Sequence, residues 1–300
     1  MGRAYDLPHA TFEVPMAGSP RSHAAGDGRP TSPAPAGGYG KDLFPPARQG
    51  EAARIDYGAL AYDDVTFRRL TTLGAGPGWA CLDVGAGTGT VTRWLAGIAG
   101  VDRVLALDRD TRFLEVPPGR RVRTVTADLD GPEPDDPDLG PGRFDLVHCR
   151  FVLMHLPRHD ALLARLANWV AAGGWLVVSD AVDLTTDHST HPAYRRTMAA
   201  MWHALSDTIG TDVSWVTDTP QRLRSQGLSE VGAEIYVPPL TPDAPVTAFW
   251  RATWERMRPA LESGGLVDAA TVDEALAYLA SPELADLSPG MITTWGRRPS

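Results

Sequence analysis

The stretch LDVGAGTGT, residues 82 to 90, decides the fold of this 300-residue chain. An apolar run that carries Asp83 is followed by three glycines at alternating positions, Gly85, Gly87 and Gly89. Glycine lacks the Cβ atom that would keep a ligand away from the backbone, and the first turn of a helix presents free N–H groups. A strand, a glycine-rich turn and a helix in this order therefore predict a binding site for a nucleotide cofactor.

Strand and helix patterns alternate along the chain around this turn. A helical pattern begins near residue 55 and stops at Gly74. The expected strands are 80–84, 103–107, 122–125, 144–149 and 175–179, and the expected helices between them include 88–98 and 159–170. Continuous apolar runs separated by helices are typical of a parallel sheet that is covered on both faces. The sequence therefore predicts an α/β fold with a doubly wound sheet.

The first fifty residues differ from the rest in composition. They contain eight prolines and eight glycines and show little apolar periodicity. This composition predicts a tail without stable structure at residues 1–50 and a folded domain at residues 51–300. The alternative is a tail that becomes ordered over a bound substrate, with the apolar run 5–16 as the segment that docks.

Helices dominate the chain after Asp180. The expected elements are late strands at 231–237 and 291–295, and helices at 191–208, 219–226, 246–262 and 271–280. The helical segments at about 188–212 and 245–282 are too long for simple connections between strands. We expect them to form a cap over the carboxyl edge of the sheet.

Acidic residues stand at three successive strand ends, at Asp83, Asp108 and Asp128. A carboxylate at the second strand end can accept hydrogen bonds from two ribose hydroxyls. Asp128 is suited to accept a hydrogen bond from an adenine amine. Three carboxylates favour a ligand that carries a positive charge and no phosphate, because a pyrophosphate would be repelled by Asp83. The pattern therefore favours S-adenosylmethionine (SAM) over NAD.

With these features the sequence resembles the class I SAM-dependent methyltransferases. The matching segments are LDVGAGTG (82–89), VLALD (104–108), TADL (126–129), FDLVHCRFVLMHLP (144–157) and AAGGWLVVSD (171–180). The resemblance implies a Rossmann-like sheet of seven strands in the order 3-2-1-4-5-7-6, with the last strand antiparallel. It also implies that SAM is the cofactor and S-adenosylhomocysteine (SAH) the product.

The resemblance assigns parts of the cofactor to particular residues. The glycine loop and Asp83 would hold the methionine end, Asp108 the ribose, and Asp128 with Leu129 the adenine, while Cys149 and Arg150 would border the methionine amino or carboxylate group. The expected cofactor-binding residues are Asp83, Gly85, Ala86, Gly87, Gly89, Asp108, Arg109, Asp128, Leu129, Cys149 and Arg150.

Methyl transfer requires an aligned acceptor and, where the acceptor is protonated, a base. His155 and Asp180 are the expected acid–base pair, because the resemblance extends to small-molecule O-methyltransferases with a His and an Asp at these places. His188 and His191 are further candidates for the base. The alternatives are a capping role for His155 and a solvated strand-end carboxylate for Asp180.

The same loop offers a weak metal-binding pattern. His188, His191, Asp183 and Asp187 lie close together in sequence, but the chain has no Cys set and no His-Glu-x-x-His motif. We therefore expect no metal site.

Four tryptophans of the expected cap could line an acceptor pocket or simply pack between helices: Trp202, Trp215, Trp250 and Trp254.

Composition narrows the partners and the compartment. A formal net charge of -9 argues against nucleic acid or an anionic membrane as the main partner. Lys41 is the only lysine, so Schiff-base chemistry lacks a credible nucleophile, and the preference for arginine suggests a GC-rich, bacterial genome. Cys81 and Cys149 are expected to lie beyond disulfide reach. We expect a soluble, cytoplasmic protein, and the tail could exchange between subunits of a homo-oligomer.

These observations together predict methyl transfer from SAM to a small-molecule acceptor. O-methylation is favoured over N- or C-methylation, and bacterial natural-product biosynthesis is the expected setting. Two alternatives remain open: an NAD(P)-dependent oxidoreductase with the same fold, and a SAM-binding protein that acts as a sensor or a cyclase-like scaffold without methyl transfer.

Overall fold

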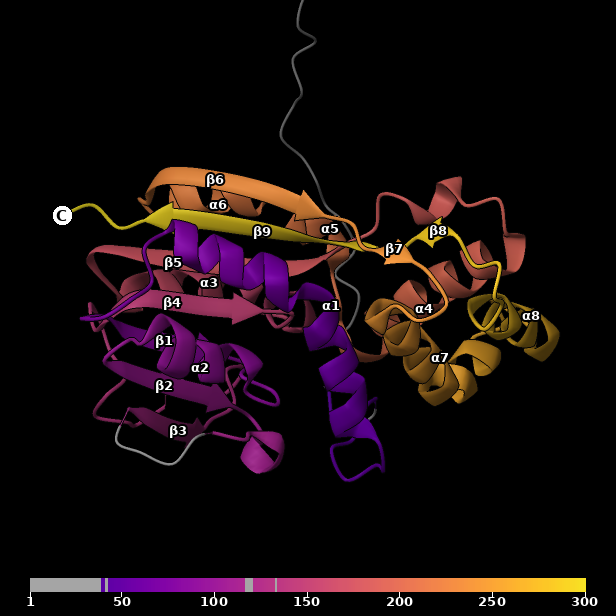
Figure 1. Ribbon diagram of the computed structural model, residues 1–300, viewed down its shortest axis with the longest axis horizontal. Helices are drawn as coiled ribbons and strands as arrows, with labels where there is room; N and C mark the ends of the chain where they lie inside the picture. Colours follow the sequence, from indigo (N-terminus) through magenta and orange to yellow (C-terminus); the bar gives the residue numbers. More distant parts are fainter. Residues whose placement is uncertain (1–38, 41–42, 117–120, 133) are drawn as a thin grey trace, which may run out of the picture. The chain divides into compact units, whose positions relative to one another are not determined.

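A seven-stranded sheet forms the centre of the fold (Figure 1). The computed structural model describes residues 39–40, 43–116, 121–132 and 134–300. Most of the expected tail, including the apolar run 5–16, lies outside the described residues. The sheet consists of β1 (Ala80–Val84), β2 (Arg103–Asp108), β3 (Val122–Thr126), β4 (Phe144–Arg150), β5 (Val170–Val182), β6 (Ser229–Tyr236) and β9 (Gly290–Arg297).

The strand order is β3-β2-β1-β4-β5-β9-β6. Neighbouring strands from β3 to β5 run parallel, whereas β9 pairs antiparallel with both β5 and β6. The last long strand of the chain therefore lies between the fifth and the sixth. This arrangement confirms the predicted order 3-2-1-4-5-7-6 with an antiparallel last strand.

Alternate side chains of the central strands enter two separate cores. Leu82 and Val84 of β1 belong to one buried cluster with leucines of α3 (His159–Trp169). Cys81 belongs to another cluster, with Leu70 of α1 (Glu51–Thr72) and Leu95. Both faces of β1 are buried because side chains alternate along a strand and both cores are apolar.

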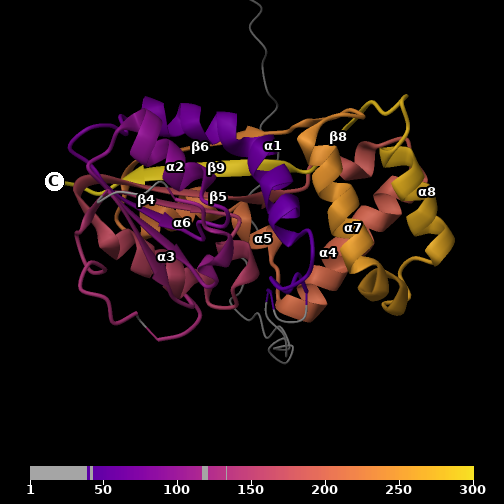
Figure 2. The ribbon, with the colours of Figure 1, turned by 60° about the horizontal axis from the view of Figure 1, so that its bottom comes forward.

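Helices cover both faces of the sheet (Figure 2). On one face lie α1 and α2 (Thr90–Trp94), and α2 continues as a π-helical turn at Leu95–Ala99. On the other face lie α3, α5 (Val213–Val216) and α6 (Thr219–Ser225). The expected helix at 88–98 is thus α-helical only as far as Trp94.

The cap consists of three helices beyond the carboxyl ends of the central strands (Figure 1). They are α4 (Pro192–Ile209), α7 (Pro245–Ser263) and α8 (Ala269–Leu279), accompanied by the short pair β7 (Pro239–Leu240) and β8 (Asp286–Leu287). Their apolar faces form a third core that includes Trp250 and Trp254. Both segments that the sequence singled out as a cap are therefore helical.

Phe44, from the segment expected to be a tail, is buried in the core of the cap.

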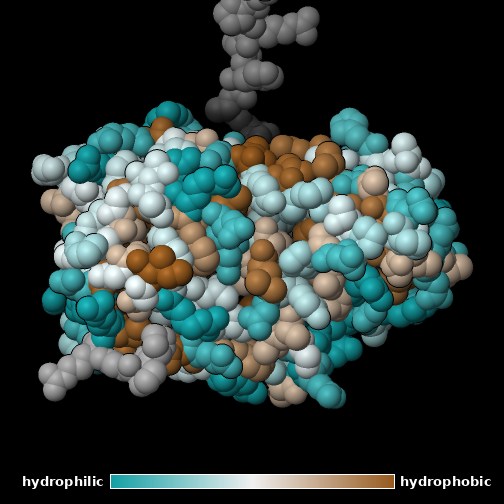
Figure 3. All heavy atoms as spheres, viewed as in Figure 1, coloured by the Kyte–Doolittle hydropathy of each residue, from teal (hydrophilic) through white to brown (hydrophobic). Residues whose placement is uncertain are grey.

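On the face drawn in Figure 3, hydrophobic residues form small groups between hydrophilic ones. In the described ranges, no helix combines the length and the apolar character needed to cross a membrane.

β5 is longer than the sequence predicts. The expected strand at 175–179 extends to Val182, because antiparallel pairing with β9 continues as far as Val182 and Gly290. Asp180 therefore lies inside the strand, opposite Ile292, instead of on a loop at the strand end.

Both cysteines should be unreactive in the native protein. Cys81 and Cys149 are free and fully buried, and burial raises the pKa of each thiol. We expect a thiol reagent at pH 8 to modify neither cysteine within minutes and both once guanidinium unfolds the chain. Reaction of either thiol in the native state at the rate of a free cysteine would contradict the placement of β1 and β4.

Candidate functional site

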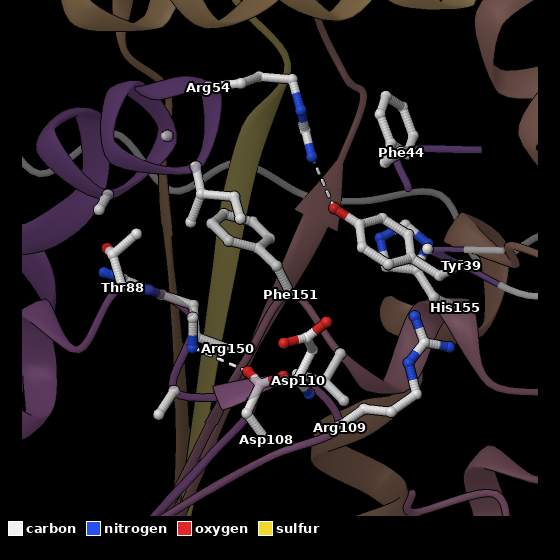
Figure 4. Close-up of a pocket in the computed structure, with 18 of the residues that line it drawn as sticks. Tyr39, Phe44, Arg54, Thr88, Asp108, Arg109, Asp110, Arg150, Phe151 and His155 are labelled. Atoms are coloured by element: carbon white, nitrogen blue, oxygen red, sulfur yellow. Dashed lines mark hydrogen bonds between the residues drawn. The ribbon is translucent and has the colours of Figure 1, made fainter. Parts of the chain in front are cut away.

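A cavity of about 310 Å³ lies at the carboxyl edge of the sheet. Its walls come from the loops after β1 to β4, from α1 and from the cap helices α4 and α7. Cavities of this size typically take small molecules. Figure 4 shows side chains from α1 and from the chain after β1, β2 and β4 around the same space. We call the part lined by the glycine loop, Asp108 and Asp128 the strand-edge end. The part lined by Tyr39, Arg54 and the residues of α4 and α7 is the helical end.

The glycine loop forms part of the strand-edge end. Gly85, Gly87 and Gly89 all have positive φ angles, between 57° and 84°. A Cβ atom on Gly85 would overlap the side chain of Val152, so glycine is required there by both conformation and space. The carbonyl of Leu107 on β2 accepts hydrogen bonds from the N–H groups of Gly85 and Ala86. The loop is therefore held in place by the neighbouring strand.

Asp108 and Asp128 both face the cavity from the ends of β2 and β3. Asp108 accepts hydrogen bonds from the Gly87 N–H at 2.8 Å and from the Asp110 N–H at 2.9 Å. Burial raises the pKa of Asp108, although these two hydrogen bonds act against the shift. Arg109 and Leu129 follow the two aspartates and also line the cavity.

Eight of the eleven expected cofactor-binding residues line the cavity. They are Gly85, Ala86, Gly87, Asp108, Arg109, Asp128, Leu129 and Arg150. Asp83, Gly89 and Cys149 do not line it. Cys149 faces the core beneath the sheet, and Gly89 is the residue before the first turn of α2.

Asp83 is buried under the glycine loop with only 2% of its surface exposed. One carboxylate oxygen lies 2.9 Å from Nδ1 of His148 on β4, and the other accepts a hydrogen bond of 2.6 Å from Thr92 on α2. Burial acts to raise the pKa of Asp83, but the contacts with His148 and Thr92 outweigh it and lower the pKa below its ordinary value. Asp83 thus connects β1, β4 and α2 behind the cavity wall.

Aromatic side chains form most of the helical end. The aromatic residues that line it include Tyr39, Phe44, Tyr62, Phe151, Trp202, Phe249 and Trp250. The ring of Tyr39 lies 4.9 Å from the ring of His155 and 5.4 Å from the ring of Phe44. Flat apolar walls of this kind can hold a planar molecule.

Arg54 of α1 enters the helical end as a buried cation. Its guanidinium bonds to both carboxylate oxygens of Glu51 and donates a hydrogen bond of 2.7 Å to the hydroxyl of Tyr39. The same group lies 4.2 Å from the centre of the Phe44 ring. In Figure 4 it extends from α1 toward Tyr39.

His155 lines the cavity, but its neighbours differ from those expected. Its Nδ1 lies 2.8 Å from the hydroxyl of Thr211, and it makes no hydrogen bond with Asp180 among the described contacts. Burial, together with the nearby charge of Arg54, lowers the pKa of His155 to about 3. The imidazole is therefore neutral at physiological pH.

Asp180 and His188 do not line the cavity. Asp180 is 1% exposed, and the backbone at Val152 and Met154, not His155, lies against its carboxylate. Its pKa is raised well above the ordinary value by burial. His188 is exposed in the short helical turn Thr186–His188, and His191 stacks on Tyr278 of α8. The expected pair of His155 and Asp180 is therefore not formed.

In the described parts of the chain, no group of three or more His, Cys, Asp or Glu residues is placed to hold a metal.

The sequence missed most of the helical end. Tyr39, Arg54 and Phe249 come from three distant segments, and no local pattern joins them. For Arg54 the sequence offers one local signal, a charged pair with Glu51 that is spaced to meet on one helical face. Of the tryptophans singled out in the cap, Trp202 and Trp250 line the cavity.

The sequence and fold match known proteins. Residues 54–217 match the model of a protein family described as a methyltransferase domain. The chain is 27% identical over 199 residues to methyltransferase str2 of Strobilurus tenacellus, covering 65% of this chain and 70% of the relative. It is 28% identical over 200 residues to trans-aconitate 2-methyltransferase of Mycobacterium sp. strain KMS, covering 62% of this chain and 73% of the relative.

A solved structure shares the fold at low sequence identity. It is phosphoethanolamine N-methyltransferase 2 of Haemonchus contortus in complex with phosphomonomethylethanolamine and SAH, with 16% identity and a TM-score of 0.53. The alignment covers 86% of this chain but 59% of the nematode protein, so the chain spans less than two thirds of that protein.

Replacing Asp83 with Asn should reveal its contribution to stability. We expect the free energy of unfolding to fall by about 3 kcal/mol at pH 7, because the buried carboxylate loses its charge while His148 keeps its position. The folded-state pKa of Asp83 is lowered, so this deficit should be complete above about pH 4 and shrink as the pH falls below 3.8.

Urea unfolding from pH 3 to pH 7 measures the deficit. Asp187→Asn, in an exposed position, is the control and should match the parent protein throughout. A deficit for Asp83→Asn that grows toward acid pH would contradict the assignment.

Proposed function

The chain belongs to the methyltransferase-domain family, and on that premise we propose that it transfers a methyl group from SAM to an oxygen atom of a small molecule. The single observation that carries this proposal is one continuous cavity that joins the glycine loop, Asp108 and Asp128 to an aromatic, helical end. The first part suits a nucleoside, and the second part suits a planar acceptor.

The strand-edge end provides groups for each part of SAM. We assign Asp108 to the ribose hydroxyls, Asp128 and Leu129 to the adenine, and the glycine loop with Arg150 to the methionine portion. Arg150 already bonds to Asp63 and Thr66 of α1, so it links the wall of the cavity to that helix. The structure assigns Asp83 a position behind the loop, where it supports the loop from below.

SAM, when bound, supplies an electrophilic methyl group on a positively charged sulfur. The protein has to align the acceptor with the carbon–sulfur bond and exclude water. The aromatic side chains of α4 and α7 and the ring of Tyr39 close the helical end and can do both. His155 is the cavity-lining residue of the expected catalytic set, whereas Asp180 and His188 receive no role in this proposal.

The relatives support a small-molecule acceptor. The Mycobacterium protein is a methyltransferase of trans-aconitate by its name, and the Strobilurus protein is also a methyltransferase. Natural-product biosynthesis in a bacterium remains the proposed setting, and the strong preference for arginine over lysine supports the bacterial source.

Ligand affinities test the nature of the cofactor. We expect calorimetric titration to show binding of SAM and SAH, and no binding of NADH. Asp108→Asn should weaken SAM binding about tenfold or more, because it removes a charged acceptor for the ribose hydroxyls. Asp102→Asn is the matched control, since Asp102 stands just before the opposite end of the same strand and outside the cavity.

Binding of NADH without binding of SAM would overturn the proposal in favour of an oxidoreductase. Binding of SAM without methyl transfer to any acceptor would favour the sensor alternative.

A further inference from the structure

We propose that the acceptor is a planar, aromatic carboxylic acid, bound as its carboxylate against Arg54 and Tyr39 and converted to a methyl ester. This inference rests on the proposed methyl transfer and specifies the substrate class of the same site. It is carried by the charges and the hydrogen-bond donors at the helical end.

The helical end presents a buried cation, Arg54, that has to share its anion. Glu51 is 2% exposed, and its carboxylate is shared by two guanidinium groups. Arg54 approaches it at 2.5 Å, and Nε of Arg256 on α7 approaches it at 3.3 Å. Arg54 and Arg256 therefore share the carboxylate of Glu51. Glu255 also lies near Arg256, which does not line the cavity, so Arg54 is the cation that the helical end presents to a ligand. A buried cation whose anion is shared with a second cation is incompletely neutralised, and an anionic ligand would stabilise it further.

Two hydrogen-bond donors that line the cavity have no acceptor among the described residues. Nε and Nη2 of Arg54 bond to Glu51 and Tyr39, while Nη1 makes no hydrogen bond to any described residue. The hydroxyl of Tyr39 accepts a hydrogen bond from Arg54 and keeps its own proton available to donate. Arg54 and Tyr39 both line the cavity. A carboxylate can accept from both donors, and hydrogen bonds to charged groups are the strong ones.

The walls around these donors select a flat molecule. Phe44 and Phe249 lie over the guanidinium of Arg54, at 4.2 Å and 5.4 Å from its central carbon to the ring centres. Trp250 packs edge-on against Phe249 and also against Trp202. These rings line an apolar space that has the guanidinium of Arg54 on one side. An aromatic carboxylic acid matches this space in shape and in charge.

The cavity also favours an acceptor that needs no base. His155 is the one imidazole among the described residues that line the cavity, and its pKa of about 3 makes it a poor proton acceptor. A phenol with a pKa near 10 would have to lose a proton before it could attack, whereas a carboxylic acid with a pKa near 4 is already ionised at neutral pH. The site therefore fits a nucleophile that arrives as an anion.

The reaction step balances without a proton transfer. A carboxylate oxygen attacks the methyl carbon, and a new carbon–oxygen bond forms as the carbon–sulfur bond breaks. The electron pair of the broken bond stays on sulfur, which becomes the neutral thioether of SAH. The acceptor becomes a neutral methyl ester, so the negative and the positive charge disappear together.

Binding of simple probes tests the charge requirement. The probes are benzoate, cinnamate and 2-naphthoate, each compared with its primary amide and titrated with and without saturating SAH. We expect each carboxylate to bind at least tenfold more tightly than its amide. Arg54→Gln should abolish this difference. Arg54→Lys should keep part of it, and it serves as the test if Arg54→Gln does not fold.

A second variant should act in the opposite direction. Glu51→Gln removes the anion that partly neutralises Arg54, so the carboxylates should bind several-fold more tightly. Arg258→Gln is the control, because Arg258 forms an exposed pair with Glu262 and Asp273 on the outside of the cap. This change should leave probe binding unaltered. Equal binding of carboxylate and amide, or no effect of Arg54→Gln and Arg54→Lys, would overturn the inference.

The chemistry of the product provides an independent readout. With SAM that carries a labelled methyl group, label transferred to the acids should be released as methanol by mild alkali, as for a methyl ester. Label that survives alkali would overturn the ester. Failure of the proposed function is distinguishable, because SAM and SAH would then not bind, whereas binding of the carboxylates without SAH would still depend on Arg54.

Discussion

The candidate site depends on one buried carboxylate, that of Asp83. It holds His148 of β4 with one oxygen and Thr92 of α2 with the other, and therefore fixes both the strand and the helix that flank the glycine loop. A buried charge is tolerated only when it is paired and hydrogen-bonded, and Asp83 meets both conditions. Nε2 of His148 has no hydrogen-bond partner within the described ranges, so the network has no spare contact to replace Asp83.

The strand-edge end of the cavity could be predicted because it is built from contiguous sequence. In a parallel sheet the residue that follows each strand lies at the same edge, so a pattern of strand ends is also a pattern in space. Gly85, Asp108 and Asp128 therefore meet as the sequence predicts. The same reasoning could not tell whether a residue points into the cavity or into the core. Asp83 and Cys149 lie within strands, where side chains alternate between opposite directions.

The helical end could not be predicted because distant segments form it by tertiary packing. Arg54 at the start of α1 meets Tyr39 from the preceding segment and Phe249 from α7, about two hundred residues later in the chain. Asp180 illustrates the same limit within the sheet. The length of β5 is decided by its pairing with β9, the last strand of the chain. No local pattern at Asp180 contains that information. Propensity and periodicity give the existence of an element more reliably than its end.

The two ends of the cavity favour ligand charges of opposite sign. This difference can favour binding of the reactants over binding of the products. Asp108, Asp110 and Asp128 outnumber Arg109 at the strand-edge end, where Arg150 is already paired with Asp63. At the helical end, Arg54 has to share the carboxylate of Glu51 with Arg256. Each end can thus attract one charged reactant in surroundings where charges interact strongly. Methyl transfer to a carboxylate removes both reactant charges at once. With the acceptor proposed above, the electrostatic attraction would be strongest before transfer and lost from both products, which would favour their release.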